Sequence, residues 1–163
     1  MFKYSLHTAA LVAAMLLTPC AFAQDAAPMS QQSAAMAASA PRDPSLKPVF
    51  AEFGGKPGLV TLMNDFMDNL MADSRTRPYF ADTDHKRIKA ELVDQFCVIL
   101  DGPCTYTGKD MVKVHRTLGI NRAAFNALVE DLQTAMDKNH VPFRAQNKLL
   151  AKLAPMHPAI ITK

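Results

Sequence analysis

Apolar residues recur at three- and four-residue intervals over the first half of the folded chain, as on one face of an α-helix. The first series predicts a helix with apolar positions at Leu59, Leu62, Met63, Phe66, Met67 and Leu70. Asp73, Ser74 and Pro78 interrupt this helix. Thr83 or Asp84 is expected to cap the next helix, whose apolar positions are Ile88, Leu92, Val93, Phe96 and Leu100.

The second half continues with the same helical spacing. Asp101-Gly102-Pro103 ends the preceding helix, and a looser segment leads to a short helix around 110–118 that Gly119 closes. A long helix follows, with Phe125, Leu128, Val129, Leu132 and Met136 on one face, and Pro142 opens a last helix with Leu149, Leu150 and Leu153. No segment alternates as a strand would, so the fold class is all-α, with five or six helices.

The N-terminus has the pattern of a secretory signal peptide. Lys3 supplies a positive start, an apolar stretch runs from Ala9 to Leu17, and Ala21-Phe22-Ala23 is a small-x-small cleavage site. We expect cleavage after Ala23 and a periplasmic or secreted protein without stable membrane insertion. A retained anchor is disfavoured because a span needs roughly 20 apolar residues. Lipidation at Cys20 is disfavoured by Pro19 directly before it.

Composition divides the rest into a linker and one domain. Residues 24–47 are rich in Ala, Ser, Gln and Pro and are predicted to form a flexible linker, whereas residues 48–163 form a single folded domain. The net charge is only +3 and the basic residues form no run, so nucleic-acid binding is not expected.

Two cysteines remain after the predicted cleavage. Cys97 and Cys104 lie seven residues apart, and an exported protein can keep a disulfide between the end of a helix and the following loop. The alternative is that Cys97 is a small buried hydrophobe and Cys104 a loop thiol. The sequence leaves both possibilities open.

Several motifs in this order resemble group I truncated haemoglobins. They are Phe53-Gly54-Gly55, Asp65-Phe66, Pro78-Tyr79-Phe80, Gly102-Pro103 with Tyr106-Thr107-Gly108, and Met111–His115 followed by Leu118-Gly119-Ile120. Each motif alone is weak, but their order and spacing agree over residues 49–158. The resemblance implies a truncated globin, a two-over-two helical sandwich around haem b.

His115 is the expected proximal ligand of the haem iron. Of the five histidines, it is the one on a short helix among apolar neighbours, and it falls at the family's proximal position. His85 is more simply an exposed polar residue, and His140 and His157 are expected to be solvated or to cap helices.

The resemblance also implies the lining of the haem pocket. Beside His115, the expected apolar contacts are Phe66, Phe80, Phe96, Met111, Val114, Ile120 and Leu128. Thr83, Arg87 and Tyr106 match positions near the haem propionates, where a cation forms charge-assisted hydrogen bonds. For the apolar residues the alternative is plain core packing, and for the polar ones a solvated surface.

The distal side departs from the family pattern. The distal positions are Phe66, Met67, Ile88 and Leu92, although relatives that hold oxygen tightly usually carry tyrosine at the second and often glutamine at one of the last two. Without a donor we expect weak oxygen affinity, since a hydrogen bond to a charge-like acceptor contributes roughly 1–3 kcal/mol. Met67 is alternatively a sixth iron ligand, as in His–Met electron-transfer haems.

The expected function is reversible binding of a diatomic gas (oxygen, carbon monoxide or nitric oxide) by a monomeric globin. Alternatives are electron transfer with an extracytoplasmic donor, or nitric oxide dioxygenase or peroxidase chemistry, so enzymatic activity is left open. A haem-free helical interaction module is the alternative from another class, and the ten methionines are its best support.

Overall fold

A computed structural model describes residues 38–163 as a two-layered helical domain, without a strand in this range. The predicted signal peptide, the predicted cleavage site and residues 24–37 of the predicted linker lie outside the described residues. The helices are α2 (Lys47–Glu52), α3 (Gly55–Ala72), α4 (His85–Ile99), α5 (Met111–His115), α6 (Arg122–Lys138), α7 (Phe143–Leu153) and α8 (His157–Ile160), with 3₁₀ turns at Pro44–Leu46, Arg77–Tyr79 and Ala154–Met156.

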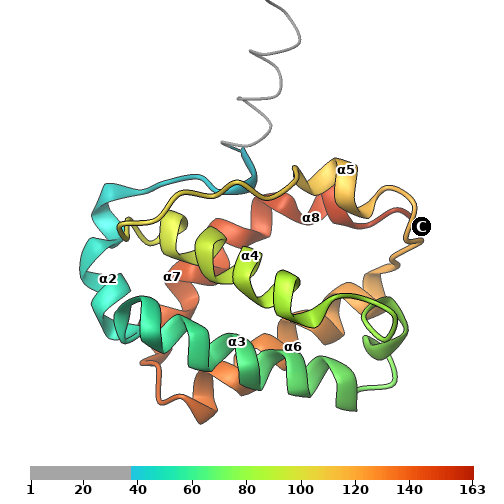
Figure 1. The fold of residues 1–163 in the computed structure, drawn as a ribbon, viewed down its shortest axis with the longest axis horizontal. Helices are drawn as coiled ribbons and strands as arrows, with labels where there is room; N and C mark the ends of the chain where they lie inside the picture. The colour runs from blue at the N-terminus through green and yellow to red at the C-terminus, as the bar shows by residue number, and fades with distance from the viewer. Residues whose placement is uncertain (1–37) are drawn as a thin grey trace, which may run out of the picture.

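The two layers are helix pairs that cover each other. In Figure 1, α3 and α4 lie in front of α6 and α7; α3 packs against both α4 and α6, and α7 packs against α4 and α6. Apolar side chains from all four helices meet between the layers, among them the fully buried Met63, Leu70, Ile99, Met136 and Leu149. The predicted all-α, two-over-two architecture is confirmed.

Side-chain caps determine where three of the helices begin. Asp84 accepts a hydrogen bond from the Arg87 backbone N–H at 3.0 Å, and Asp110 and Asn121 cap α5 and α6 in the same way. Of the two residues expected to cap α4, Asp84 therefore does so. The Thr83 hydroxyl instead donates to the Phe80 carbonyl at 2.7 Å.

The corner between α2 and α3 depends on glycine. Gly54 and Gly55 have φ values of 74° and 63°, a left-handed conformation that other residues rarely adopt. At Gly58 a Cβ atom would lie 1.9 Å from the Phe53 carbonyl oxygen, so α3 passes too close to α2 for any side chain. These glycines turn the chain so that α3 enters the first layer.

The described part of the predicted linker packs against the domain. Ser39, Ala40 and Leu46 are at most 6% exposed, and the Asp43 backbone N–H contacts the Ile99 carbonyl at 3.4 Å. Residues 38–47 therefore belong to the folded unit, because their small and apolar side chains find space against α4 and α7.

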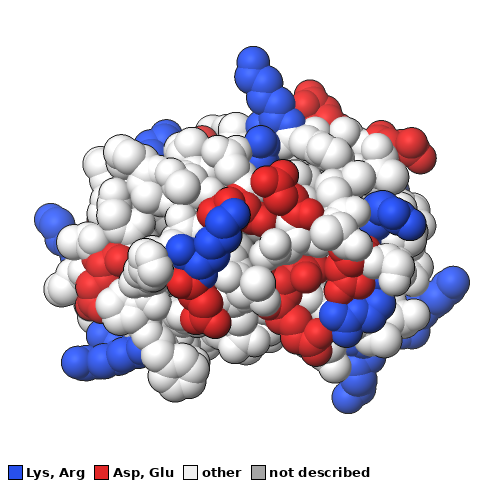
Figure 2. Space-filling model, turned by 90° about the horizontal axis from the view of Figure 1, so that it is seen from below, with Lys and Arg blue, Asp and Glu red and all other residues white. Residues whose placement is uncertain are grey.

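The charged surface is mixed. On the face shown in Figure 2, acidic and basic side chains are interspersed, which agrees with the small net charge. Among the described residues, no helix has both the length and the apolar character needed to cross a membrane.

Candidate functional site

His115 lies at the end of α5, with one ring nitrogen held and the other open. Its Nδ1 lies 2.7 Å from the Met111 carbonyl oxygen, one turn earlier on the same helix. A carbonyl oxygen only accepts, so Nδ1 carries the proton and Nε2 keeps its lone pair. Nε2 has no hydrogen-bond partner within residues 38–163.

The surroundings of His115 favour its neutral form. Burial lowers the pKa of His115, and the hydrogen bond to Met111 opposes this effect only in part. Among the described residues, every fully buried side-chain nitrogen or oxygen has a hydrogen-bond partner. Because Nε2 of His115 has none, it is not fully buried and can be reached by a ligand. A neutral imidazole with an open Nε2 is ready to bind a metal ion.

The side chains around His115 suit a metal ion that is already coordinated by a macrocycle. Within the part of the chain that the structure describes, no three His, Cys, Asp or Glu residues are grouped as they would be around a bare metal ion. A single imidazole beside apolar side chains instead suits a macrocycle-bound iron, which needs one strong axial ligand from the protein. The residues present therefore fit a haem group.

The predicted distal side chains come together on α3 and α4. Phe66 and Met67 are each 3% exposed, and the half-buried Ile88 and Leu92 pack against the same cluster. None of these four side chains has a hydrogen-bond donor. They form an apolar wall.

The remaining apolar candidates divide into two groups. Phe80, Phe96, Met111 and Leu128 pack in or against the same core cluster as the distal residues. Val114 is half-buried and Ile120 is buried, but both lie outside that cluster.

The polar candidates are engaged with protein partners. Arg87 is about half exposed and pairs with Glu91 at 2.9 Å. The Tyr106 hydroxyl donates to the Lys109 carbonyl at 2.8 Å, and burial, followed by the nearby Glu91 and Asp110, raises the pKa of Tyr106 to about 12. Tyr106 therefore stays protonated and braces its own loop.

Asp65, the residue before Phe66 on α3, is bound to the end of α6 rather than to the distal cluster. Its carboxylate accepts hydrogen bonds from Lys138 at 2.6 Å and from Asn139 at 2.8 Å, which joins α3 to the end of α6. These hydrogen bonds lower the pKa of Asp65. Similarly, the His157 ring packs edge-on against Phe125, with 4.8 Å between ring centroids, and is only half solvated.

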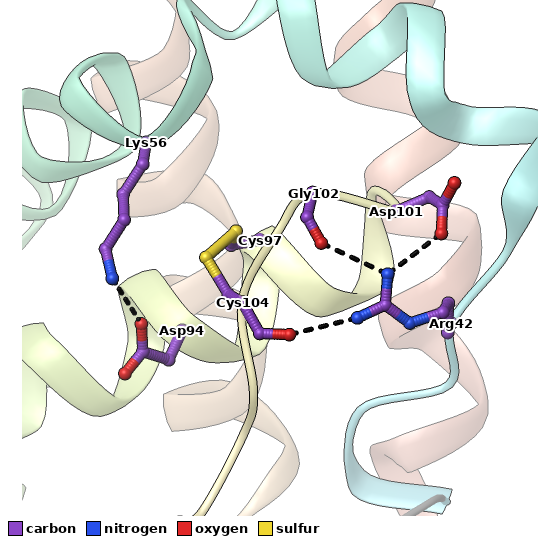
Figure 3. The surroundings of a disulfide bond; sticks show 7 residues. All are labelled: Arg42, Lys56, Asp94, Cys97, Asp101, Gly102 and Cys104. Atoms are coloured by element: carbon purple, nitrogen blue, oxygen red, sulfur yellow. Dashed lines mark hydrogen bonds and ion pairs between the residues drawn. A yellow bond between two sulfur atoms is a disulfide. The ribbon is translucent and has the colours of Figure 1, made fainter.

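Cys97 and Cys104 form a disulfide, one of the two possibilities left open by the sequence. Their Cα atoms are 5.9 Å apart, and the bond joins the end of α4 to the loop that leads to α5 (Figure 3). The loop between the disulfide and His115 is therefore tethered at its start.

Sequence reasoning missed three polar residues near α5. Gln95 is 4% exposed, and its Nε2 donates to the Ser39 carbonyl and lies 3.7 Å from the Met111 sulfur. Ser39 and Arg42 approach α5 and its loop from the N-terminal segment. A lone glutamine inside the apolar run of α4 was the one available signal, since polar side chains are rarely buried without a partner.

A separate cavity of about 520 Å³ lies between the N-terminal segment, α5 and α7–α8. It contacts Met111 but none of the four distal residues and not His115. Its lining is Ala38, Ser39, Pro41, Asp110, Met111, Val112, Ala151, Lys152, Pro155, Met156 and Ala159.

A family sequence model described as Bacterial-like globin matches residues 48–162, which is most of the chain. The chain belongs to the bacterial-like globin family. This globin is 30% identical to the Group 1 truncated hemoglobin GlbN of Mycolicibacterium paratuberculosis, over 70% of the chain and 84% of that relative. It is 28% identical to GlbN of a Nostoc species, over 71% of the chain and 98% of that relative.

Solved structures agree with this fold. Truncated hemoglobin from Tetrahymena pyriformis in its Fe(III) form superposes on the globin with a TM-score of 0.67 at 22% identity, over 71% of this chain and 98% of that one. The 2/2 hemoglobin of a Synechococcus species gives a TM-score of 0.65 at 17% identity, with the same coverage, and that protein carries a covalently attached heme.

Proposed function

We propose that this globin binds haem b, with Nε2 of His115 as the proximal ligand of the iron, and reversibly binds a diatomic gas on the opposite side. The observation that carries the proposal is the half-buried His115 ring, protonated on Nδ1 by its hydrogen bond to Met111 and open at Nε2. When bound, haem supplies an iron centre with a free coordination position for a small ligand.

The distal residues determine what that position favours. Phe66, Met67, Ile88 and Leu92 are apolar and offer no donor to a ligand that becomes polarised on binding. A missing hydrogen bond of roughly 1–3 kcal/mol corresponds to about one to two orders of magnitude in affinity. Weak oxygen binding with little discrimination against carbon monoxide follows, and the pocket is poorly suited to a dioxygenase that starts from a stable oxygen complex.

We also propose that the globin acts outside the cytoplasm, after cleavage behind Ala23. The disulfide between Cys97 and Cys104 supports this location, because such bonds persist in oxidising compartments. Mass spectrometry of protein from a periplasmic fraction tests both points. A mature chain that begins at Gln24 with two fewer thiol hydrogens is expected, and an uncleaved or cytoplasmic chain would contradict the proposal.

Optical spectra of the ferric, ferrous and carbonyl forms test the haem proposal. Wild type is expected to give a Soret band, and His115→Ala is expected to lose most of its haem affinity. His140→Ala is the matched control, because His140 is exposed and lies in the turn between α6 and α7. Failure of wild type to take up haem, or unchanged spectra in His115→Ala, would refute the proposal.

Met67 supports a second candidate, electron transfer through His–Met ligation. Its thioether is buried among the distal side chains. A sulfur-to-iron charge-transfer band in the ferric spectrum, lost in Met67→Leu, would establish this role. The absence of that band in wild type leaves Met67 as an apolar part of the distal wall.

A further inference from the structure

The N-terminal segment 39–43, which we call the strap, runs from the start of α5 along the loop that precedes it. The strap precedes the region matched by the family model, yet Ser39 is only 3% exposed. It contacts α4, the loop closed by the disulfide, the first residue of α5, and α7. Each of these contacts includes a hydrogen bond or an ion pair.

One line of hydrogen bonds runs from the strap to the proximal imidazole. The Ser39 hydroxyl oxygen accepts a hydrogen bond from the Met111 backbone N–H at 3.0 Å. The carbonyl of the same Met111 residue accepts the proton of His115 Nδ1 at 2.7 Å. The strap therefore holds the residue that orients the ring, at a distance of 72 positions along the sequence.

Arg42 holds the loop before α5 in a similar way. Its guanidinium donates to the Asp101 carboxylate at 2.9 Å and to the carbonyls of Gly102 and Cys104 at 3.1 and 3.0 Å (Figure 3). Cys104 is also joined to α4 through Cys97. The loop is thus fixed at one point by a covalent bond and by three hydrogen bonds from the strap.

The packing of α5 comes from α8 and from Met111 against the core, and the rest of the helix is less well covered. The helix has five residues, its Val112 is 58% exposed, and the cavity of about 520 Å³ borders it on the side of the strap. A short helix beside a cavity has few apolar contacts to fix its rotation. Polar contacts from the strap supply that constraint.

We propose that Ser39 and Arg42 are positioning residues for the proximal ligand, and that the strap sets the orientation of the His115 imidazole. The inference rests on the proposed function, since it concerns the histidine that would bind iron. Loss of either strap contact allows α5 to move, which changes the bond between His115 and the iron without removing the ligand.

Resonance Raman spectroscopy of the ferrous protein tests this directly through the iron–histidine stretching band. In Ser39→Ala and Arg42→Ala this band is expected to shift and broaden, and transfer of haem to an acceptor apoglobin should accelerate about five- to ten-fold, as for the loss of one hydrogen bond. In the carbonyl form, solvent exchange of the His115 Nδ1 proton should also become faster. Arg42→Lys, which keeps the charge but fewer hydrogen bonds, should lie between wild type and Arg42→Ala.

Lys56→Ala is the matched control. Lys56 forms an ion pair with Asp94 of α4 at 2.9 Å, close to the same disulfide, but it makes no hydrogen bond to the strap, the loop or α5 (Figure 3). The iron–histidine band of Lys56→Ala should match that of wild type, even if the thermal midpoint of this variant falls as much as that of Ser39→Ala.

The outcomes separate the two proposals. If wild type binds haem through His115 but the band and the Nδ1 exchange are unchanged in the strap variants, the strap proposal is overturned and the haem proposal stands. If wild type takes up no haem, both are overturned. Should Ser39→Ala or Arg42→Ala fail to fold, Arg42→Lys decides the matter, since an unchanged band in that variant contradicts the role of Arg42.

Discussion

The distal and proximal walls of the proposed haem pocket are built in different ways. The distal wall belongs to α3 and α4, helices of 18 and 15 residues, with Phe66 and Met67 of α3 almost fully buried. The proximal wall is a five-residue helix between loops, and its position depends on a disulfide, Ser39, Gln95 and Arg42.

The two walls are therefore held in place by different kinds of interaction. Dispersion and burial act over many contacts, so the distal wall is stable but insensitive to the loss of a single polar group. Hydrogen bonds are few and directional, so the proximal wall is less stable but defines the orientation of one ring. Substitutions on the two sides should therefore affect different properties.

The largest effect is expected from shortening a buried side chain in the distal layer. Leu70 of α3 is 0% exposed, and Leu70→Ala should lower the free energy of unfolding by about 2–5 kcal/mol because it leaves a cavity. Val112→Ala on α5 is the counterpart, with an expected change within about 0.5 kcal/mol. Denaturant unfolding followed by circular dichroism measures both, and similar losses in the two variants would contradict the comparison.

The next largest loss of stability is expected from removal of the disulfide, which lies on the proximal side. Cys97 and Cys104 are seven residues apart, and closing so short a loop contributes about 2–3 kcal/mol to stability. The double variant Cys97→Ala, Cys104→Ala should lose this amount and become insensitive to reductant. Wild type in reductant is the control, and a protein equally stable with and without reductant would show that the bond contributes little.

The sequence allowed the helices of the layer formed by α3 and α4, and their buried faces, to be predicted well. Residues such as Leu59, Met63 and Phe66 recur at helical spacing, and that spacing follows directly from which face of α3 is buried. The pattern therefore predicted both the helix and its core face. The sequence did not reveal the partners of polar residues such as Asp65, which lie at the end of α6 and directly after it, 73 and 74 positions away.

The constraints on the proximal wall were not predictable in the same way. His115 was singled out by its apolar neighbours and by a motif, both local in sequence. Ser39 and Arg42 lie in a segment whose Ala- and Pro-rich composition predicted a flexible linker, and nothing local shows that they contact Met111 or Cys104. Contacts between distant segments leave no periodic pattern, and the same holds for the partner of Gln95.

A hydrogen-bond donor introduced into the distal wall should raise the affinity for oxygen. Met67→Tyr places a hydroxyl in an apolar cluster, and a hydrogen bond there is worth about 1–3 kcal/mol to a polarised ligand. Oxygen dissociation measured by stopped flow should slow by about ten- to a hundred-fold. Met67→Phe is the matched control, with similar bulk and no hydroxyl, and equal rates in the two variants would show that the pocket obtains a donor elsewhere.

The smallest effect on the free energy of unfolding is expected at Asp65, a polar contact of α3. Hydrogen bonds from Lys138 and Asn139 hold the pKa of this carboxyl below its ordinary value of 3.8, so its ionised form is stabilised by folding. That contribution is complete above the unfolded pKa and is lost as the pH falls through the lower, folded value. Asp65→Asn should therefore cost about 1 kcal/mol or less at neutral pH, because Lys138 is largely exposed, and nothing in strong acid. The effect is measured by unfolding this variant from neutral pH down to pH values below the pKa of the free carboxyl. Asp68→Asn, whose side chain is exposed, is unfolded under the same conditions as the control. A loss at Asp65 that persists in acid would mean that the amide disturbs packing between α3 and α6, so that steric fit rather than charge joins these helices.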